Sequence, residues 1–182
     1  LDYGAGNVRS VINAIEKLGG SVKVVSKPED VINAEKLVFP GVGSFGSMMH
    51  ILEKKGYVDP LKTFLQSGKP FFGICLGMQA LFESSEEAPG ICGLGILKGL
   101  VKQFQIDKSV PHIGWNGVNL KKSSRIFNDA AQSEKYYFVH SYYVAPEEQA
   151  VVLTTTDYGL EFVSSVESGS VTGTQFHPEK SG

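Results

Sequence analysis

The sequence predicts an α/β fold, in which an open, mostly parallel β-sheet forms the middle of three layers and continues into an antiparallel C-terminal half. Two observations lead to this prediction. Up to Phe82, short β-branched runs alternate with apolar residues at helical spacing, and glycines separate them. Beyond Gly95, strand-like runs follow one another with few helical stretches. We therefore expect a helix-covered parallel half and a later half folded onto the same sheet.

The first half gives strand, turn and helix signals in regular order. We expect strands at 1–3, 21–25, 36–39 and 70–74, and helices at 8–18 and 48–65, the second interrupted near 56–60. Gly19 and Gly20 stop the first helix. Gly41 and Gly43 mark a loop after the third strand, because glycine accepts backbone angles that other residues avoid.

The second half is a series of short strands in a single domain. Residues 84–95 are expected to form a loop, and strands are expected at 96–106, 117–120, 136–144, 150–155, 162–166 and 171–176. The chain of 182 residues contains no internal repeat and has the size of one α/β domain, spanning 1–182. It opens without Met and stops at Gly182 without a closing helix, so we expect this domain to be truncated at both ends.

Composition excludes several classes of function. The net charge is −2 and the chain has no basic run, which argues against nucleic acid or an anionic membrane as a partner. No apolar stretch approaches the roughly 20 residues that a membrane helix needs. The two cysteines, Cys75 and Cys92, are too few for a disulfide framework and favour a reducing compartment. Small-molecule chemistry fits this composition better.

Cys75 is the strongest candidate for a nucleophile. The apolar run 70–74 leads into Gly73-Ile74-Cys75-Leu76-Gly77, after which apolar residues recur at helical spacing. This order is typical of a nucleophile elbow, here with cysteine in place of serine. The glycines leave room for neighbouring strands, and the free amides at the helix start favour the reactive thiolate. The alternative is a cysteine packed as a small hydrophobic residue, and for Cys92 in its loop we prefer a packed or merely tolerated thiol.

His177 and Glu179 are the candidates for a base and for the group that orients it. His177 ends the run 171–176, and Pro178 and Glu179 follow it. Residues two apart in extended backbone point to the same side, so the carboxylate can accept from one ring nitrogen while the other faces the thiol. We expect Cys75, His177 and Glu179 to meet at the carboxyl ends of strands. Alone, this segment could equally be a strand-end turn with a solvated acid.

The other three histidines have simpler interpretations. His50 lies in an expected helix and reads as a surface or packing residue. His112 and His140 each neighbour an expected strand and read as core histidines whose hydrogen bonds are satisfied.

These segments resemble a known family, the class I (triad) glutamine amidotransferases, through Gly73-Ile74-Cys75-Leu76-Gly77-Met78-Gln79 and Phe176-His177-Pro178-Glu179. Within that family the chain is similar to the glutaminases of imidazole glycerol phosphate synthase. The segments that carry this second likeness are 2–7, 40–46, 112–116, 137–142 and 175–181. The resemblance implies a flavodoxin-like fold and an enzyme that hydrolyses glutamine to glutamate and ammonia, without cofactor or metal.

The resemblance also implies two groups of residues around the triad: backbone N–H groups that hold the oxyanion, and residues that bind glutamine. The first group is Val42, Gly43 and Leu76, and the second is Gly41, Gln79, Ser141 and Tyr142. A peptide flip in the loop 40–43 is part of what the resemblance implies. Gln79 could instead be a solvated helix residue, and Ser141 an ordinary strand residue.

A partner is implied as well. In the resembling enzymes a cyclase (β/α)₈ barrel, fused C-terminally or as a separate subunit, uses the ammonia in histidine biosynthesis to make imidazole glycerol phosphate and aminoimidazole carboxamide ribotide from a phosphoribulosyl precursor. Asn7, Trp115 and Asn116 would lie at this junction, although a lone tryptophan more often anchors a core. Ammonia is largely protonated near neutral pH, so a closed passage between the two sites makes chemical sense. We expect a cytoplasmic location, or a plastid in a plant or alga.

Three other hypotheses stay open at this point. The chain could be the glutaminase of another amidotransferase pathway, or a different cysteine hydrolase on the same fold. It could also be a binding module in which the triad is vestigial. Labelling of Cys75 by an electrophilic glutamine analogue separates a glutaminase from the other classes.

Overall fold

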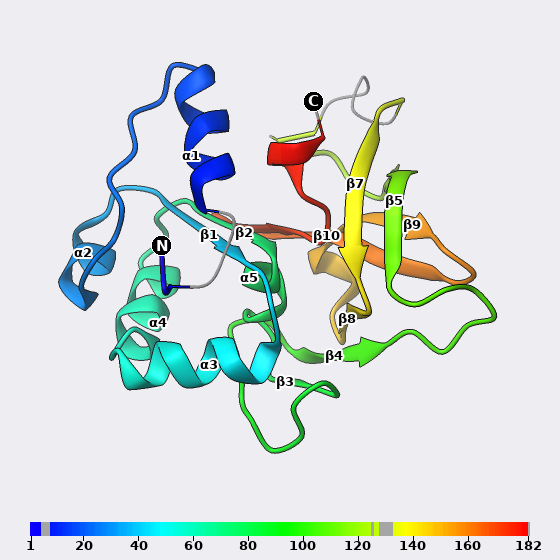
Figure 1. The fold of residues 1–182 in the computed structure, drawn as a ribbon, viewed down its shortest axis with the longest axis horizontal. Helices are drawn as coiled ribbons and strands as arrows, with labels where there is room; N and C mark the ends of the chain where they lie inside the picture. The colour runs from blue at the N-terminus through cyan, green and yellow to red at the C-terminus, as the bar shows by residue number, and fades with distance from the viewer. Residues whose placement is uncertain (5–7, 125, 128–132, 182) are drawn as a thin grey trace.

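The computed structural model describes residues 1–4, 8–124, 126–127 and 133–181. Its helices are α1 (Val8–Lys17), α2 (Pro28–Asn33), α3 (Phe45–Lys54), α4 (Val58–Gln66) and α5 (Leu76–Gln79), with 3₁₀ turns η2 (Gln149–Val151) and η3 (Pro178–Lys180). Its strands are β1 (Leu37–Gly41), β2 (Phe71–Cys75), β3 (Ser84–Ser85), β4 (Gly99–Gln103), β5 (His112–Gly117), β6 (Asn119–Leu120), β7 (Lys135–His140), β8 (Tyr142–Pro146), β9 (Val152–Asp157), β10 (Glu161–Ser168) and β11 (Val171–Thr174). Figure 1 shows their arrangement.

The main sheet of the described chain combines a parallel and an antiparallel half. Its order is β1-β2-β11-β10-β8-β4-β3, with β9 paired to β10 and β6 paired to β9. β1, β2 and β11 run parallel, whereas β10, β8 and β4 pair antiparallel. The predicted α/β class and antiparallel second half are confirmed, and the sheet is more evenly mixed than the sequence predicts. Antiparallel neighbours need no helical crossover, and the second half has few helices to provide one.

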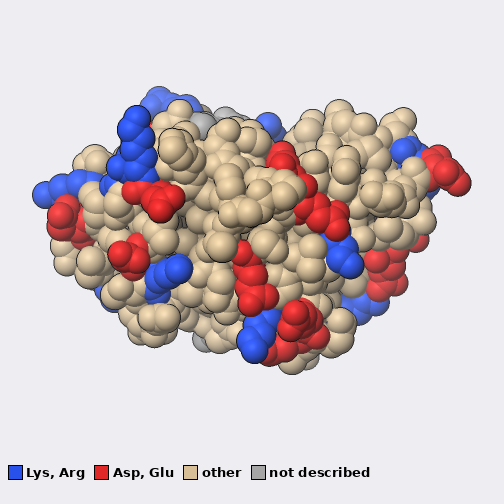
Figure 2. All heavy atoms as spheres, turned by 90° about the horizontal axis from the view of Figure 1, so that it is seen from below, with Lys and Arg blue, Asp and Glu red and all other residues tan. Residues whose placement is uncertain are grey.

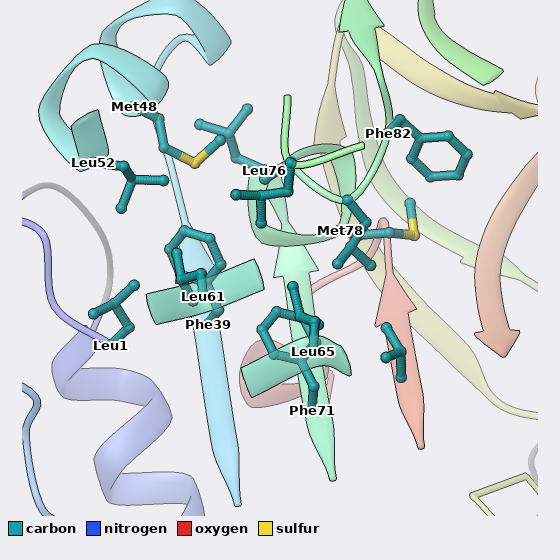
Figure 3. Packing of buried hydrophobic residues seen from close by; sticks show 14 of the residues in the cluster. Leu1, Phe39, Met48, Leu52, Leu61, Leu65, Phe71, Leu76, Met78 and Phe82 are labelled. Carbon is teal, nitrogen blue, oxygen red and sulfur yellow. The ribbon is translucent and has the colours of Figure 1, made fainter. Parts of the chain in front are cut away.

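Helices cover both faces of the parallel half, which gives three layers (Figure 1). On one face, Val11 of α1 packs against Ile74 and the half-buried Phe72. On the other face, Phe39 and Phe71 belong to the larger cluster that includes side chains of α3, α4 and α5. Figure 3 shows this second face. Successive residues of a strand point to opposite faces, so a single short strand such as β2 supplies both interfaces.

Two segments that the sequence predicts as strands belong to no strand in the structure. Residues 1–3 lie against the sheet, where the backbone nitrogen of Leu1 donates to the carbonyl of Val38 at 2.6 Å. In 21–25 only Val25 is buried, and Val24 is exposed. Strand preference reflects packing on a half-buried surface, and the β-branched side chains of 21–25 lack such a surface.

The predicted strand 136–144 is interrupted at Ser141. Its first part, β7, pairs with β5 in a separate two-stranded sheet, and its second part, β8, lies between β10 and β4 of the main sheet. β5 and β7 stand side by side in Figure 1. The chain therefore crosses between the two sheets at Ser141, which brings irregular backbone close to the carboxyl end of β2.

The surface carries charges of both signs. On the face drawn in Figure 2, Lys and Arg side chains are interspersed with Asp and Glu rather than gathered by sign. No helix within the described residues is long and apolar enough to cross a membrane.

Candidate active site

Cys75 occupies a strained turn between β2 and α5. Its φ is +54° and its ψ is −109°, and it is the one non-glycine residue of the described chain with positive φ. Strain of this kind is found at functional sites that the surrounding structure holds in place. The predicted strand-to-helix elbow is therefore confirmed. α5 has only four residues, so any stabilisation of a thiolate by this helix comes from its first amides rather than from a long dipole.

Gly73 and Gly77 flank Cys75, and neither position has space for a side chain. A Cβ at Gly77 would lie 1.9 Å from the Phe39 carbonyl oxygen, and one at Gly73 would lie 2.7 Å from the Gly77 carbonyl oxygen. Both obstacles are backbone atoms, which cannot rotate away. The two glycines let the elbow lie directly against the strands.

We expect Gly77→Ala to lower the free energy of unfolding by about 3 kcal/mol, because the added methyl forces β1 and the elbow apart. Gly117→Ala is the matched control, since a Cβ there has no neighbour within 4 Å. Urea unfolding of both variants tests this expectation. A loss of less than about 1 kcal/mol at Gly77 would show that the strands can shift at little cost.

The loop after β1 lies beside Cys75. Gly41 pairs in register with Cys75 on the neighbouring strand, so Val42 and Gly43 follow at the height of the sulfur. Gly43 has φ +98° and no atom within 4 Å of its Cβ position, which leaves its backbone room to move. The hydroxyl of Tyr3 donates to the Val42 carbonyl at 3.1 Å and holds that side of the loop.

His177 and Glu179 lie next to Cys75 because β11 runs parallel to β2. Thr174 of β11 pairs with Ile74 of β2, and Cys75 follows Ile74 directly. The chain therefore leaves β11 beside Cys75. Nδ1 of His177 lies 2.8 Å from Oε1 of Glu179, and both side chains are buried. The predicted extended geometry is wrong for Glu179, which lies in the 3₁₀ turn η3, where the fixed φ of Pro178 favours the turn over extension. The turn folds the carboxylate back onto the ring.

The electrostatics of this group favour a protonated imidazole. Burial lowers the pKa of His177, but hydrogen bonding to Cys75 and Glu179 and the charges of both outweigh this and raise the pKa to about 9. At neutral pH the ring carries its proton, and a cation beside the sulfur favours thiolate. Within the described residues Nε2 of His177 has no geometrically good hydrogen bond, so it remains for the thiol or a substrate.

A cleft of about 320 Å³ opens over the sulfur. It is lined by six of the predicted oxyanion and glutamine residues together with Cys75 and His177: Val42, Gly43, Leu76, Gln79, Ser141 and Tyr142. Gly41 is the one predicted glutamine-binding residue that does not line the cleft, because it packs against the elbow, where a Cβ would lie 2.9 Å from the Cβ of Leu76. Glu179 lies behind His177. No group of three or more His, Cys, Asp or Glu in the described chain could hold a metal ion.

Gln79 is buried in the wall of the cleft rather than solvated, which removes the alternative interpretation of a surface helix residue. It is 3% exposed, and its Nε2 donates to the Tyr142 carbonyl at 3.2 Å and to Oε1 of Gln175 at 3.0 Å. Sequence reasoning did not single out Gln175, or Glu87, which lines the cleft and accepts from the amide of Phe45 at 2.8 Å. Glu87 lies in a segment predicted only as loop, which offers no signal for its role.

The remaining histidines and Cys92 agree with their sequence interpretations. His112 and His140 are buried, and Nδ1 of His112 lies 3.3 Å from Nε2 of His140. Burial lowers the pKa of His112 to about 4 and that of His140 to about 3, so both are neutral core histidines. His50 is exposed on α3, and Cys92 is an exposed free thiol.

The predicted interface residues lie partly on the exposed face of the β5–β7 sheet. Trp115 is 54% exposed and Ile113 is 60% exposed, so Trp115 is not a core anchor. Trp115 packs edge-on against Tyr137 across the strand pair. Asn116 is held locally, donating from Nδ2 to the Asp157 carbonyl at 2.9 Å. Asn7 lies outside the described residues.

Comparison with known proteins places this geometry in a family. The model of the family described as glutamine amidotransferase class-I matches residues 1–182. A protein of Aquifex aeolicus named imidazole glycerol phosphate synthase subunit HisH is 50% identical over 182 residues, covering this whole chain and 88% of that protein. The chloroplastic imidazole glycerol phosphate synthase HisHF of Arabidopsis thaliana is 47% identical over 186 residues, but this chain spans only 31% of its length.

A solved structure described as a glutamine amidotransferase has the same fold, with a TM-score of 0.77 at 22% identity over 96% of this chain and 87% of that one. The chain therefore belongs to the class I glutamine amidotransferases and, within them, to the HisH family of imidazole glycerol phosphate synthase.

Proposed function

We propose that this chain is the glutaminase of an imidazole glycerol phosphate synthase, with Cys75 as nucleophile, His177 as its acid and base, and Glu179 as the group that orients the ring. The observation that carries the assignment of these roles is their convergence at the carboxyl ends of β2 and β11, with Nδ1 of His177 2.8 Å from Glu179. The domain 1–182 supplies the ammonia that a cyclase barrel consumes.

In the first half of the reaction the Cys75 thiolate attacks the γ-carbonyl carbon of glutamine. A carbon–sulfur bond forms and the carbonyl oxygen becomes an oxyanion, which backbone N–H groups of Leu76 and of the Val42–Gly43 loop stabilise. The imidazolium of His177 then gives its proton to the amide nitrogen, the carbon–nitrogen bond breaks and ammonia leaves. A glutamyl thioester on Cys75 remains.

In the second half water replaces the sulfur. The neutral His177 takes a proton from the water as it attacks the thioester carbonyl, a second oxyanion forms, and its collapse breaks the carbon–sulfur bond. Glutamate leaves, and the thiolate and imidazolium are restored together. Glu179 keeps its charge throughout and fixes the ring so that Nε2 faces the reacting atoms.

The amino-acid end of glutamine needs one partner for each of its charges. Glu87 is the carboxylate in the cleft wall and suits the α-ammonium group. The backbone at Ser141 and Tyr142 also lines the cleft and offers polar groups to the α-carboxylate. Gln79 lies in the wall beside them and keeps the Tyr142 carbonyl in place.

The exposed apolar face of β5 and β7 suits a partner surface. Ile113 and Trp115 project from β5, opposite Val139 and Tyr137 of β7. Val139 also lines the active-site cleft, so a partner seated on this face would reach the mouth through which ammonia leaves. A large exposed aromatic beside apolar neighbours is typical of an interface anchor. We propose that the cyclase barrel covers it, either as a fused domain or as a separate subunit.

Trp115→Ala is expected to weaken binding of the cyclase barrel by about thirtyfold, the size of a tryptophan hot spot. Because Trp115 is half exposed, the fold should keep its stability. Leu18→Ala, directly after α1 and at a side chain that is 88% exposed, is the control and should bind as the wild type does. Titration of the barrel, with glutamate release as the signal, gives both affinities. Equal affinities for the two variants would place the interface elsewhere.

The proposed function is tested by measuring glutamate release from glutamine with the cyclase barrel present and absent, and imidazole glycerol phosphate formation in the same mixture. We expect hydrolysis to rise when the barrel is added and both products to form in equal amounts. Hydrolysis without transfer to the barrel would favour another amidotransferase pathway. The compartment that we propose is the cytoplasm, or the plastid for a plant or algal chain, as the chloroplastic name of the Arabidopsis relative suggests.

A further inference from the structure

The sulfur of Cys75 has a hydrogen-bond donor that the triad mechanism does not use. Gln175 follows β11 directly and is completely buried. Its Nε2 lies 3.5 Å from Sγ of Cys75, within the range of hydrogen bonds to sulfur. A buried amide beside a reactive sulfur is costly unless its polar atoms are used, so its contacts identify its role.

The orientation of the Gln175 amide follows from its neighbours. The Tyr142 carbonyl can only accept, so the atom of Gln79 that faces it must be Nε2. The same Nε2 lies 3.0 Å from the Gln175 amide, which must therefore present Oε1 to it. Nε2 of Gln175 is then the atom that faces the sulfur.

The hydrogen-bond network ends at the Tyr142 carbonyl, which is held in place. Nδ1 of His140 lies 2.8 Å from the Tyr142 carbonyl and must carry the hydrogen. The carbonyl thus receives donors from both His140 and Gln79, which holds it in place. A continuous network runs from this carbonyl through Gln79 and Gln175 to the sulfur of Cys75.

We propose that Gln175 is a further residue of the catalytic site, which stabilises the Cys75 thiolate through Nε2 and holds Gln79 in its position through Oε1. This inference rests on the proposed glutaminase function of Cys75. A hydrogen bond to a charged acceptor is stronger than one to a neutral acceptor, so Gln175 favours thiolate over thiol. Unlike His177, which gives up its proton when ammonia leaves, Gln175 remains a donor when the thiolate is re-formed.

The test compares three variants in the full-length protein with its cyclase barrel. Gln175→Met keeps the length of the side chain and removes both contacts. Gln79→Met leaves the donor to the sulfur and removes the contacts of Gln79 to the Tyr142 carbonyl and to Oε1 of Gln175. Thr172→Val is the control, because Thr172 is a buried residue of β11 that lines a different cavity. Thermal melts establish that each variant is folded.

Two readouts separate the roles. The first is the rate at which iodoacetamide alkylates Cys75 at neutral pH, followed by mass spectrometry of its peptide, which reports thiolate without glutamine turnover. The second is kcat and KM for glutamine. Gln175→Met should slow alkylation and lower kcat by about tenfold each, the size of a hydrogen bond to a charged group. Gln79→Met should raise KM and keep alkylation within about twofold of the wild type. Thr172→Val should change neither.

A folded Gln175→Met variant that alkylates as fast as Thr172→Val would overturn the inference. A wild-type protein that alkylates at Cys75 but releases no glutamate would instead overturn the proposed function. A second measurement does not depend on a variant: alkylation of Cys75 in the wild type should shift the side-chain amide proton signals of Gln175 and leave those of the exposed Gln149 unchanged. Unshifted Gln175 signals would also contradict the inference.

Discussion

Cys75→Ser is expected to lower kcat for glutamine hydrolysis by about 10³-fold or more, measured as glutamate release with the cyclase barrel present. The hydroxyl of serine is far harder to ionise than a thiol, so the variant lacks the preformed anion that attacks glutamine in the wild type. The site that suits a thiolate is therefore poorly suited to an alcohol. The fold should be unchanged, because serine fits the space of cysteine.

Cys92→Ser is the matched control for this experiment. Cys92 is an exposed free thiol outside the cleft, so its substitution should leave kcat within about twofold of the wild type. Unchanged hydrolysis in Cys75→Ser would remove Cys75 from the mechanism and would favour a binding module with a vestigial triad.

Glu179→Gln is expected to lower kcat/KM by about 10³-fold, because the neutral amide neither fixes the ring of His177 nor balances its charge. The carboxylate lies 2.8 Å from Nδ1 in a buried position, where water cannot replace it. Glutamate release at neutral pH measures the loss. Glu161→Gln is the control, since the side chain of Glu161 is exposed and pairs with Lys121 on the surface.

The pH profile adds a second readout for Glu179. The pKa of His177 is raised to about 9, above its ordinary value of 6.5, so the imidazolium that donates to the leaving nitrogen is present at neutral pH and is lost as pH rises through about 9. The activity of the wild type should therefore decline above about pH 9. Glu179 is one of the two groups that raise this pKa, so Glu179→Gln should begin to decline at lower pH. If the activity of Glu179→Gln declined at the same pH as that of the wild type, a group other than His177 would be responsible for the decline.

The same shift contributes to folding stability. A group whose pKa is higher in the folded than in the unfolded state stabilises the fold fully below the unfolded value, here 6.5, and this contribution disappears as pH rises through about 9. Burial opposes the shift and the contacts with Cys75 and Glu179 produce it. The contribution should therefore be smaller in Glu179→Gln over this pH window.

The strained turn at Cys75 could be predicted from the sequence because its requirements are local. A strained cysteine between a buried strand and a helix needs small residues on both sides, and the sequence has Gly73 and Gly77 at these positions. The convergence with His177 was also predictable, since parallel neighbours such as β2 and β11 present their carboxyl ends at the same edge.

The rest of the site depends on contacts between distant segments, which periodicity does not report. Gln175 and Gln79 are 96 residues apart in the chain, and their hydrogen bond exists only because β11 lies beside β2. The break at Ser141 carries no Gly or Pro signal, and it follows from two sheets competing for one run of residues. The strand predicted at 21–25 does not form for a different reason: its residues prefer a strand locally but have no surface to pack on.

Attack of Cys75 on the γ-carbonyl of glutamine can be tested by labelling with an electrophilic glutamine analogue, followed by mass spectrometry of the two cysteine peptides. We predict one adduct per chain, on Cys75 and not on the more exposed Cys92, and slower labelling in the presence of glutamine. Absence of an adduct on Cys75, or labelling that glutamine does not slow, would contradict attack on glutamine by Cys75 and favour a different cysteine hydrolase on this fold.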